Sequence, residues 1–94
     1  MNEMSKLIAL LEAAHVPYET RPHWGGSIQV GYPNFENKIC DAVCFRGSYG
    51  YEQGLLEIMG LVDEEEVGDT VEGYLTAMEV FQRIYNNYRE RYRW

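Results

Sequence analysis

The fold is decided by residues 38–62, which read KICDAVCFRGSYGYEQGLLEIMGLV. Residues 39–46 alternate and are mostly apolar on both faces, which predicts a central strand. Residues 55–62 contain good helix formers. They form only a short run between Gly54 and Gly60, however, so we expect a second strand. The stretch therefore predicts the central hairpin of a small sheet.

One charged residue lies inside the first of these strands. Asp41 shares a face with Ile39, Val43 and Phe45. A carboxylate among apolar side chains needs a partner if it is buried. At the start of a strand it can instead reach solvent, and both readings stay open at this stage.

The flanking segments complete an α+β pattern. Residues 27–32 alternate as a strand does, and residues 18–23 predict an edge strand because proline is tolerated only at an edge. Asn2 or Ser5 can cap a first helix that ends near His15. Thr76 and Glu79 have the spacing of a capping box and predict where the last helix begins. We expect one domain, residues 1–94, with three to four antiparallel strands and both helices packed on one face.

The charge is strongly asymmetric along the chain. Residues 1–82 carry four basic and fourteen acidic side chains, a balance of −10, whereas residues 83–94 carry four arginines and one glutamate. An overall charge of −7 disfavours direct nucleic-acid binding, which needs a basic surface. No apolar run is long enough to span a membrane, so we expect a cytoplasmic protein. A chain of 94 residues buries a smaller share of its unfolded surface than a larger domain does, so its stability should be modest and formation of a homodimer or higher homo-oligomer would add to it.

No catalytic signature emerges from the reactive side chains. Cys40 and Cys44 lie four apart on an expected strand, about 13 Å between Cα atoms, which is too far for a disulfide. Their spacing from His15 and His23 matches no zinc pattern. The glycines of residues 47–54 do not form a P-loop, because no Gly-Lys-Ser/Thr sequence follows. We therefore expect no catalytic residue, no metal and no cofactor, and predict that the protein is not an enzyme.

Aromatic side chains and an arginine converge on the expected loops. Exposed rings can stack on a nucleotide base, and an arginine together with glycine backbone donors can hold phosphate. The predicted ligand-binding residues are Trp24, Arg46, Gly47, Ser48, Tyr49, Gly50 and Tyr51. The alternative is that Tyr49 and Tyr51 fold back as lids over a small core.

Two segments resemble short uncharacterised proteins carried by prophages and mobile elements of Gram-positive bacteria. They are residues 40–62, CDAVCFRGSYGYEQGLLEIMGLV, and residues 72–88, EGYLTAMEVFQRIYNNY. The likeness extends over residues 28–88. It implies a phage accessory role and brings no assigned activity or site residue. Small acidic phage proteins of this kind are similar to inhibitors of host defence.

Three functions are compatible with these features. The first is a non-enzymatic protein that sequesters a nucleotide-derived signalling molecule, with Arg46 and residues 47–50 on the phosphates and the aromatic rings on the bases. The second is an acidic protein–protein inhibitor that mimics nucleic acid and binds a basic host defence nuclease. Its predicted surface comprises Asp63, Glu64, Glu65, Glu66, Asp69 and Glu72. The third is a structural or assembly module without a ligand.

Overall fold

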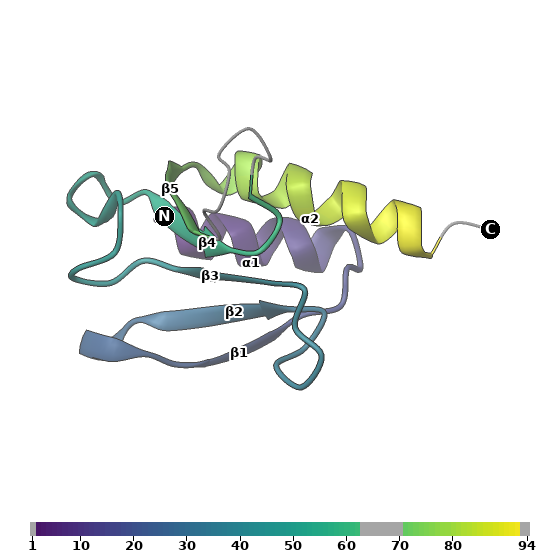
Figure 1. The fold of residues 1–94 in the computed structure, drawn as a ribbon, viewed down its shortest axis with the longest axis horizontal. Coiled ribbons are helices and arrows are strands. Elements are labelled where there is room, and N and C mark those ends of the chain that lie inside the picture. The colour runs from purple at the N-terminus through teal and green to yellow at the C-terminus, as the bar shows by residue number, and fades with distance from the viewer. Residues whose placement is uncertain (1, 63–70, 93–94) are drawn as a thin grey trace.

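The computed structural model describes residues 2–62 and 71–92 and has two helices packed on one face of a five-stranded antiparallel sheet (Figure 1). The elements are α1 (Glu3–Ala13), β1 (Glu19–Pro22), β2 (Ile28–Tyr32), β3 (Cys40–Val43), β4 (Leu56–Met59), β5 (Val71–Leu75) and α2 (Ala77–Arg91). The strands lie in the sheet in the order of the sequence, so each one pairs with its neighbour along the chain. The predicted α+β class, with both terminal helices on one face, is confirmed.

The sheet has one strand more than the sequence predicted. The four expected strands are present, with β1 at the edge, and β5 is added beside β4. The sequence of β5 is VEGYL, in which glycine weakens a strand and only Leu75 is buried. Its pairing with β4 includes a shift of register between Leu56 and Ile58. Pairing with β4 therefore makes this segment a strand, because its own side-chain pattern does not specify one.

Both helices begin at the predicted caps. Asn2 Oδ1 accepts a hydrogen bond from the backbone N–H of Ser5 at 2.8 Å. At α2 the Thr76 hydroxyl accepts from the Glu79 N–H at 3.2 Å, and the Glu79 carboxylate accepts from the Thr76 N–H at 3.0 Å. This reciprocal pair is the capping box, and it satisfies two backbone donors that the helix itself leaves unpaired.

The core lies between the helices and one face of the sheet. That face contributes the side chains of Val30, Tyr32, Cys40, Ala42, Leu56 and Ile58. The ring of Tyr32 is fully buried, and its hydroxyl donates to Asn87 Oδ1 of α2 at 2.8 Å. Burial raises the pKa of Tyr32 to about 12, so this donor keeps its proton at any physiological pH.

The opposite face carries the charged residue of the central strand. Asp41 is buried, and its carboxylate lies 2.6 Å from the ammonium group of Lys38. Of the two readings left open by the sequence, the buried one is therefore correct, and the one in which Asp41 reaches solvent is wrong. The residues between β2 and β3 supply the partner that a buried carboxylate requires.

The two helices run in the same direction, with their amino termini at the same end of the sheet (Figure 1). Glu3 of α1 joins these termini, because its Oε1 accepts a hydrogen bond from the backbone N–H of Ala77 at 2.8 Å. Lys6 lies 2.9 Å from the other carboxylate oxygen. The bond from Ala77, with a smaller contribution from Lys6, lowers the pKa of Glu3 below the usual 4.5.

The charge of Glu3 should therefore stabilise the fold in a pH-dependent way. A carboxylate whose pKa is lower in the folded state stabilises above its unfolded pKa and loses that contribution as the pH falls. We expect Glu3→Gln to lower the free energy of unfolding at pH 7 by about 0.5–1 kcal/mol. The difference from the wild type should shrink as the pH falls below 4.5, in urea titrations at several pH values. Glu36→Gln, at an exposed loop position, is the control and should follow the wild-type curve. A Glu3→Gln deficit that is the same at pH 7 and pH 3 would contradict this role.

Candidate functional site

The two connections that carry the predicted ligand-binding residues lie at one end of the sheet. In an antiparallel sheet whose strands follow one another, alternate connections lie at the same end, so the β1–β2 and β3–β4 connections are neighbours (Figure 1). The ring of His23 contacts the ring of Phe45 edge-on, with 4.7 Å between centroids. We call this end, with residues 23–27 and 44–55, the loop end. Both helix amino termini lie there as well.

The Gly-Tyr loop, residues 47–54, begins with a turn closed by Ser48. The backbone N–H of Ser48 donates to the Phe45 carbonyl at 2.8 Å, and its hydroxyl donates to the same oxygen at 2.7 Å. The Ser48 hydroxyl also accepts from the Phe45 N–H at 3.0 Å. Its side chain is thus engaged with the backbone, and any ligand would have to compete with this turn for the hydroxyl proton.

The Gly-Tyr loop is attached to the end of the sheet rather than projecting freely. The Tyr49 N–H donates to Glu57 Oε2 at 2.6 Å, and its carbonyl accepts from the Tyr74 N–H at 3.3 Å. Gly73 of β5 permits this approach, because a Cβ there would overlap Tyr49 and lie 2.7 Å from its carbonyl oxygen. Gly50 has a φ of 93° and leaves no room for a Cβ against the Tyr74 backbone, so no other residue fits well.

Attachment of the loop directs its aromatic rings outward. The side chains of Tyr49 and Tyr51 are 60% and 43% exposed, so neither covers the core. Arg46 and Gly47 are also exposed, and Trp24 on the β1–β2 connection is 75% exposed. The structure therefore brings the predicted arginine and rings to one end of the molecule, in positions that a ligand can reach.

Tyr74 adds a ring that the sequence analysis missed. It is 58% exposed and has a φ of 61°, a left-handed conformation that is costly for a tyrosine. Its backbone N–H donates a hydrogen bond to the Tyr49 carbonyl, and this bond helps to maintain the left-handed conformation. Tyr74 could have been predicted at the loop end only if β5 had been predicted as a strand beside the Gly-Tyr loop.

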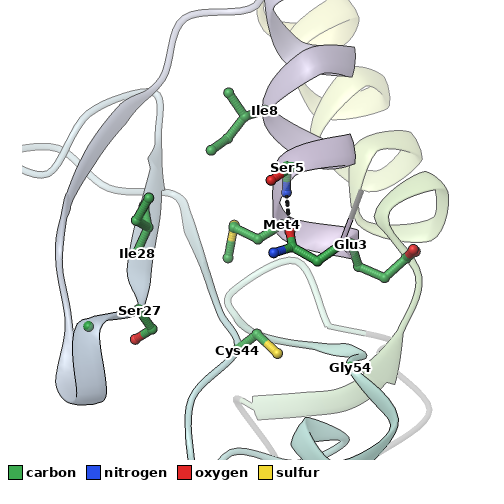
Figure 2. Close-up of a pocket in the computed structure, with 10 residues that line it drawn as sticks. Glu3, Met4, Ser5, Ile8, Ser27, Ile28, Cys44 and Gly54 are labelled. Carbon is green, nitrogen blue, oxygen red and sulfur yellow. Dashed lines mark hydrogen bonds between the residues drawn. The ribbon is translucent and has the colours of Figure 1, made fainter.

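A pocket of about 210 Å³ lies at the loop end, between the first turns of α1 and the β1–β2 connection. Figure 2 shows Met4 and Ile8 on α1 facing Ile28 across this space, with Cys44 at its base. Asn2, Ser27 and Gly54 are also among the lining residues. Trp24, Arg46, Tyr49 and Tyr51 do not line the pocket, but its lining includes Gly26, Cys44 and Gly54 from the same connections.

None of these lining residues is among the ligand-binding residues predicted from the sequence. Met4 and Ile8 fit the apolar periodicity of α1, and Ile28 fits the alternation of β2, so the pattern at each position indicates packing rather than a site. Cys44 was considered only as a thiol. Burial raises the pKa of Cys44, and it raises the pKa of Cys40 to about 12, so neither is an activated nucleophile.

The alternative acidic surface lies mostly outside the described residues. Asp63, Glu64, Glu65, Glu66 and Asp69 are in that part of the chain. Glu72 is described, and its two carboxylate oxygens accept from the Arg83 guanidinium at 2.6 and 2.8 Å. Glu72 therefore forms a bidentate ion pair with α2.

Within residues 2–62 and 71–92, no group of three or more histidine, cysteine or acidic side chains could hold a metal ion. In the same ranges, no helix is both long and apolar enough to cross a membrane. No family model, curated protein or solved structure matches the chain.

The contact between Gly73 and Tyr49 can be tested by adding a methyl group. Gly73→Ala should lower the free energy of unfolding by about 2–3 kcal/mol, because the Cβ would displace the Gly-Tyr loop. Gly54→Ala is the matched control: a Cβ there meets nothing within 4 Å, and only the positive φ of 73° opposes it, at a cost of about 1 kcal/mol. Urea unfolding measures both, and amide exchange at residues 49–51 should accelerate only in Gly73→Ala. Equal costs for the two substitutions would show that the loop does not depend on this approach.

Proposed function

We propose that this protein is a non-enzymatic phage-type binding protein that counters host defence by sequestering a nucleotide-derived signalling molecule in the cytoplasm of its bacterial host. The observation that carries the proposal is the pocket at the loop end, whose lining combines the first turns of α1 with residues of the connections that bear Trp24, Arg46, Tyr49 and Tyr51. A concave, largely apolar space beside exposed rings and an arginine suits a ligand with flat bases and phosphate groups.

The charge distribution supports small-molecule binding over contact with a nucleic acid. The chain carries −7 overall, so a polyanion would be repelled by most of its surface. A signalling nucleotide has few phosphates, and one or two cationic or backbone donors can satisfy them. Arg46 is exposed at the loop end and provides such a donor.

Binding should be visible as thermal stabilisation. At a ligand concentration 100-fold above Kd, the free energy of unfolding should rise by about 2.7 kcal/mol. For a domain of this size that corresponds to an increase in Tm of roughly 10–20 °C. The ligands to scan are cyclic mono-, di- and trinucleotides and NAD-derived signals, with differential scanning fluorimetry as the readout.

Two arginine variants, one at the loop end and one on α2 as the control, test where a nucleotide that raises the melting temperature binds. Arg46→Ala should weaken binding of any active nucleotide about tenfold or more, because a charge-assisted bond to phosphate is lost. Arg89→Ala removes another exposed arginine, from the last turns of α2, and should leave the shift unchanged. If no nucleotide in the scan changes the melting temperature, the sequestration proposal is wrong.

The second candidate is the acidic inhibitor of a basic host defence nuclease. It is favoured by the balance of −10 over residues 1–82. Because exposed charges would provide the attraction, binding to a captured nuclease should weaken steeply with added salt. Salt-independent binding would eliminate this candidate.

A further inference from the structure

We infer that the pocket at the loop end holds one uncharged planar heterocyclic ring, the base of a nucleotide, while the sugar and phosphates remain outside it. The inference rests on the proposed function in taking a nucleotide as the ligand, and it assigns the base to residues that were not predicted from the sequence to bind a ligand. It is carried by the volume, the lining and the hydrogen-bonding capacity of the pocket.

The volume of the pocket limits its occupant. An apolar cavity of about 150 Å³ binds benzene, whereas pockets for drug-sized molecules occupy roughly 300–1,000 Å³. At about 210 Å³ this pocket has room for a single heterocycle but not for a whole nucleotide. Everything beyond the ring must therefore lie at the pocket mouth.

The lining favours a flat, uncharged group. Met4, Ile8 and Ile28 supply aliphatic and thioether surface from two sides (Figure 2). Such side chains stabilise ring faces by removing them from water, and a methionine adapts its shape to the ring. The one carboxylate among the lining residues, Glu3, is held by Ala77 and Lys6. A charged ring would lose its hydration without gaining a free counter-charge here.

Two polar groups at the pocket can recognise the edge of a base. Asn2 uses its amide oxygen to cap α1, and no bond within the described residues engages its amide nitrogen, so both N–H groups can donate. Ser27 donates its hydroxyl proton to the Trp24 carbonyl at 2.6 Å and retains lone pairs that can accept. Together these donors and this acceptor complement the edge of a nucleobase, which carries both acceptors and donors. A hydrocarbon ring would leave the groups of Asn2 and Ser27 unpaired.

Residues near the pocket are available to contact the phosphates and a second base. Arg46 is two residues beyond Cys44, so its Cα lies within about 7 Å of the Cys44 Cα. Trp24 is likewise two residues from Gly26, which lines the pocket. The connections that contribute to the pocket lining therefore also carry an exposed guanidinium for phosphate and an exposed ring for a second base.

Cys44 makes occupancy of the pocket measurable. It lines the pocket and is partly exposed, whereas Cys40 is buried in the core. Iodoacetamide at pH 8.5 should alkylate Cys44 slowly and Cys40 not at all in the folded protein, so Cys40 reports any unfolding. Mass spectrometry after proteolysis follows both sites in the same sample.

The experiment compares a base without phosphate with a phosphate without base. We expect adenosine, guanosine, cytidine or uridine to slow alkylation of Cys44, by about tenfold at a concentration tenfold above Kd. Ribose 5-phosphate should leave the rate unchanged. Ile28→Trp, which fills the pocket from an exposed position, should abolish protection by the nucleoside, whereas Ile28→Val should retain it. Each rate is compared with the same variant without ligand.

The outcomes separate this inference from the proposed function. If nucleotides raise the melting temperature but neither they nor nucleosides change the Cys44 rate, the base lies elsewhere and the inference is overturned while sequestration stands. If nucleosides protect Cys44 but no signalling nucleotide raises the melting temperature, the ring site is supported and the proposed function fails. If Ile28→Trp remains folded and is still protected, the pocket does not hold the ring.

Discussion

The hydrogen bond from the Ala77 backbone to Glu3 determines how the ends of the molecule are arranged. It joins the amino termini of two parallel helices, and it adds a carboxylate to the positive dipole ends that Asn2 and the capping box of Thr76 and Glu79 satisfy only in part. Because α1 is anchored there, its first turn lies at the end of the sheet with the β1–β2 and β3–β4 connections. The pocket wall formed by Asn2, Met4 and Ile8 follows from that placement.

The sheet topology provides the other half of the arrangement. Five strands in sequence order have four connections, and two of these, β1–β2 and β3–β4, lie at the same end as both helix starts. The Gly-Tyr loop is the longest segment between strands at that end, and it is held by Glu57 and by the backbone of Tyr74. Its rings are therefore displayed on a fixed backbone, which reduces the entropy that a ligand would have to overcome on binding.

Much of the fold was predictable because local patterns and tertiary packing agree. The caps at Asn2 and Thr76 bind backbone donors only three residues away, so the sequence pattern alone predicts them. The strands β2 and β3 are predictable because their residues alternate between the two faces of the sheet. Two features were not predictable in this way. The strand character of β5 comes from pairing with β4, and the carboxylate of the buried Asp41 is paired with Lys38, which precedes β3.

The amino-acid sequence by itself determined the α+β class, the beginnings of both helices, the central hairpin and the set of rings and the arginine at the loop end. Each depends on interactions within a few residues or on the periodicity of one element. Only the tertiary structure decided that Met4, Ile8, Ile28 and Cys44 line a common pocket and that Tyr74 supports the Gly-Tyr loop. These residues come from four different parts of the chain. Their individual patterns indicate core packing, and only the relative placement of α1, the sheet and the loop reveals the space between them.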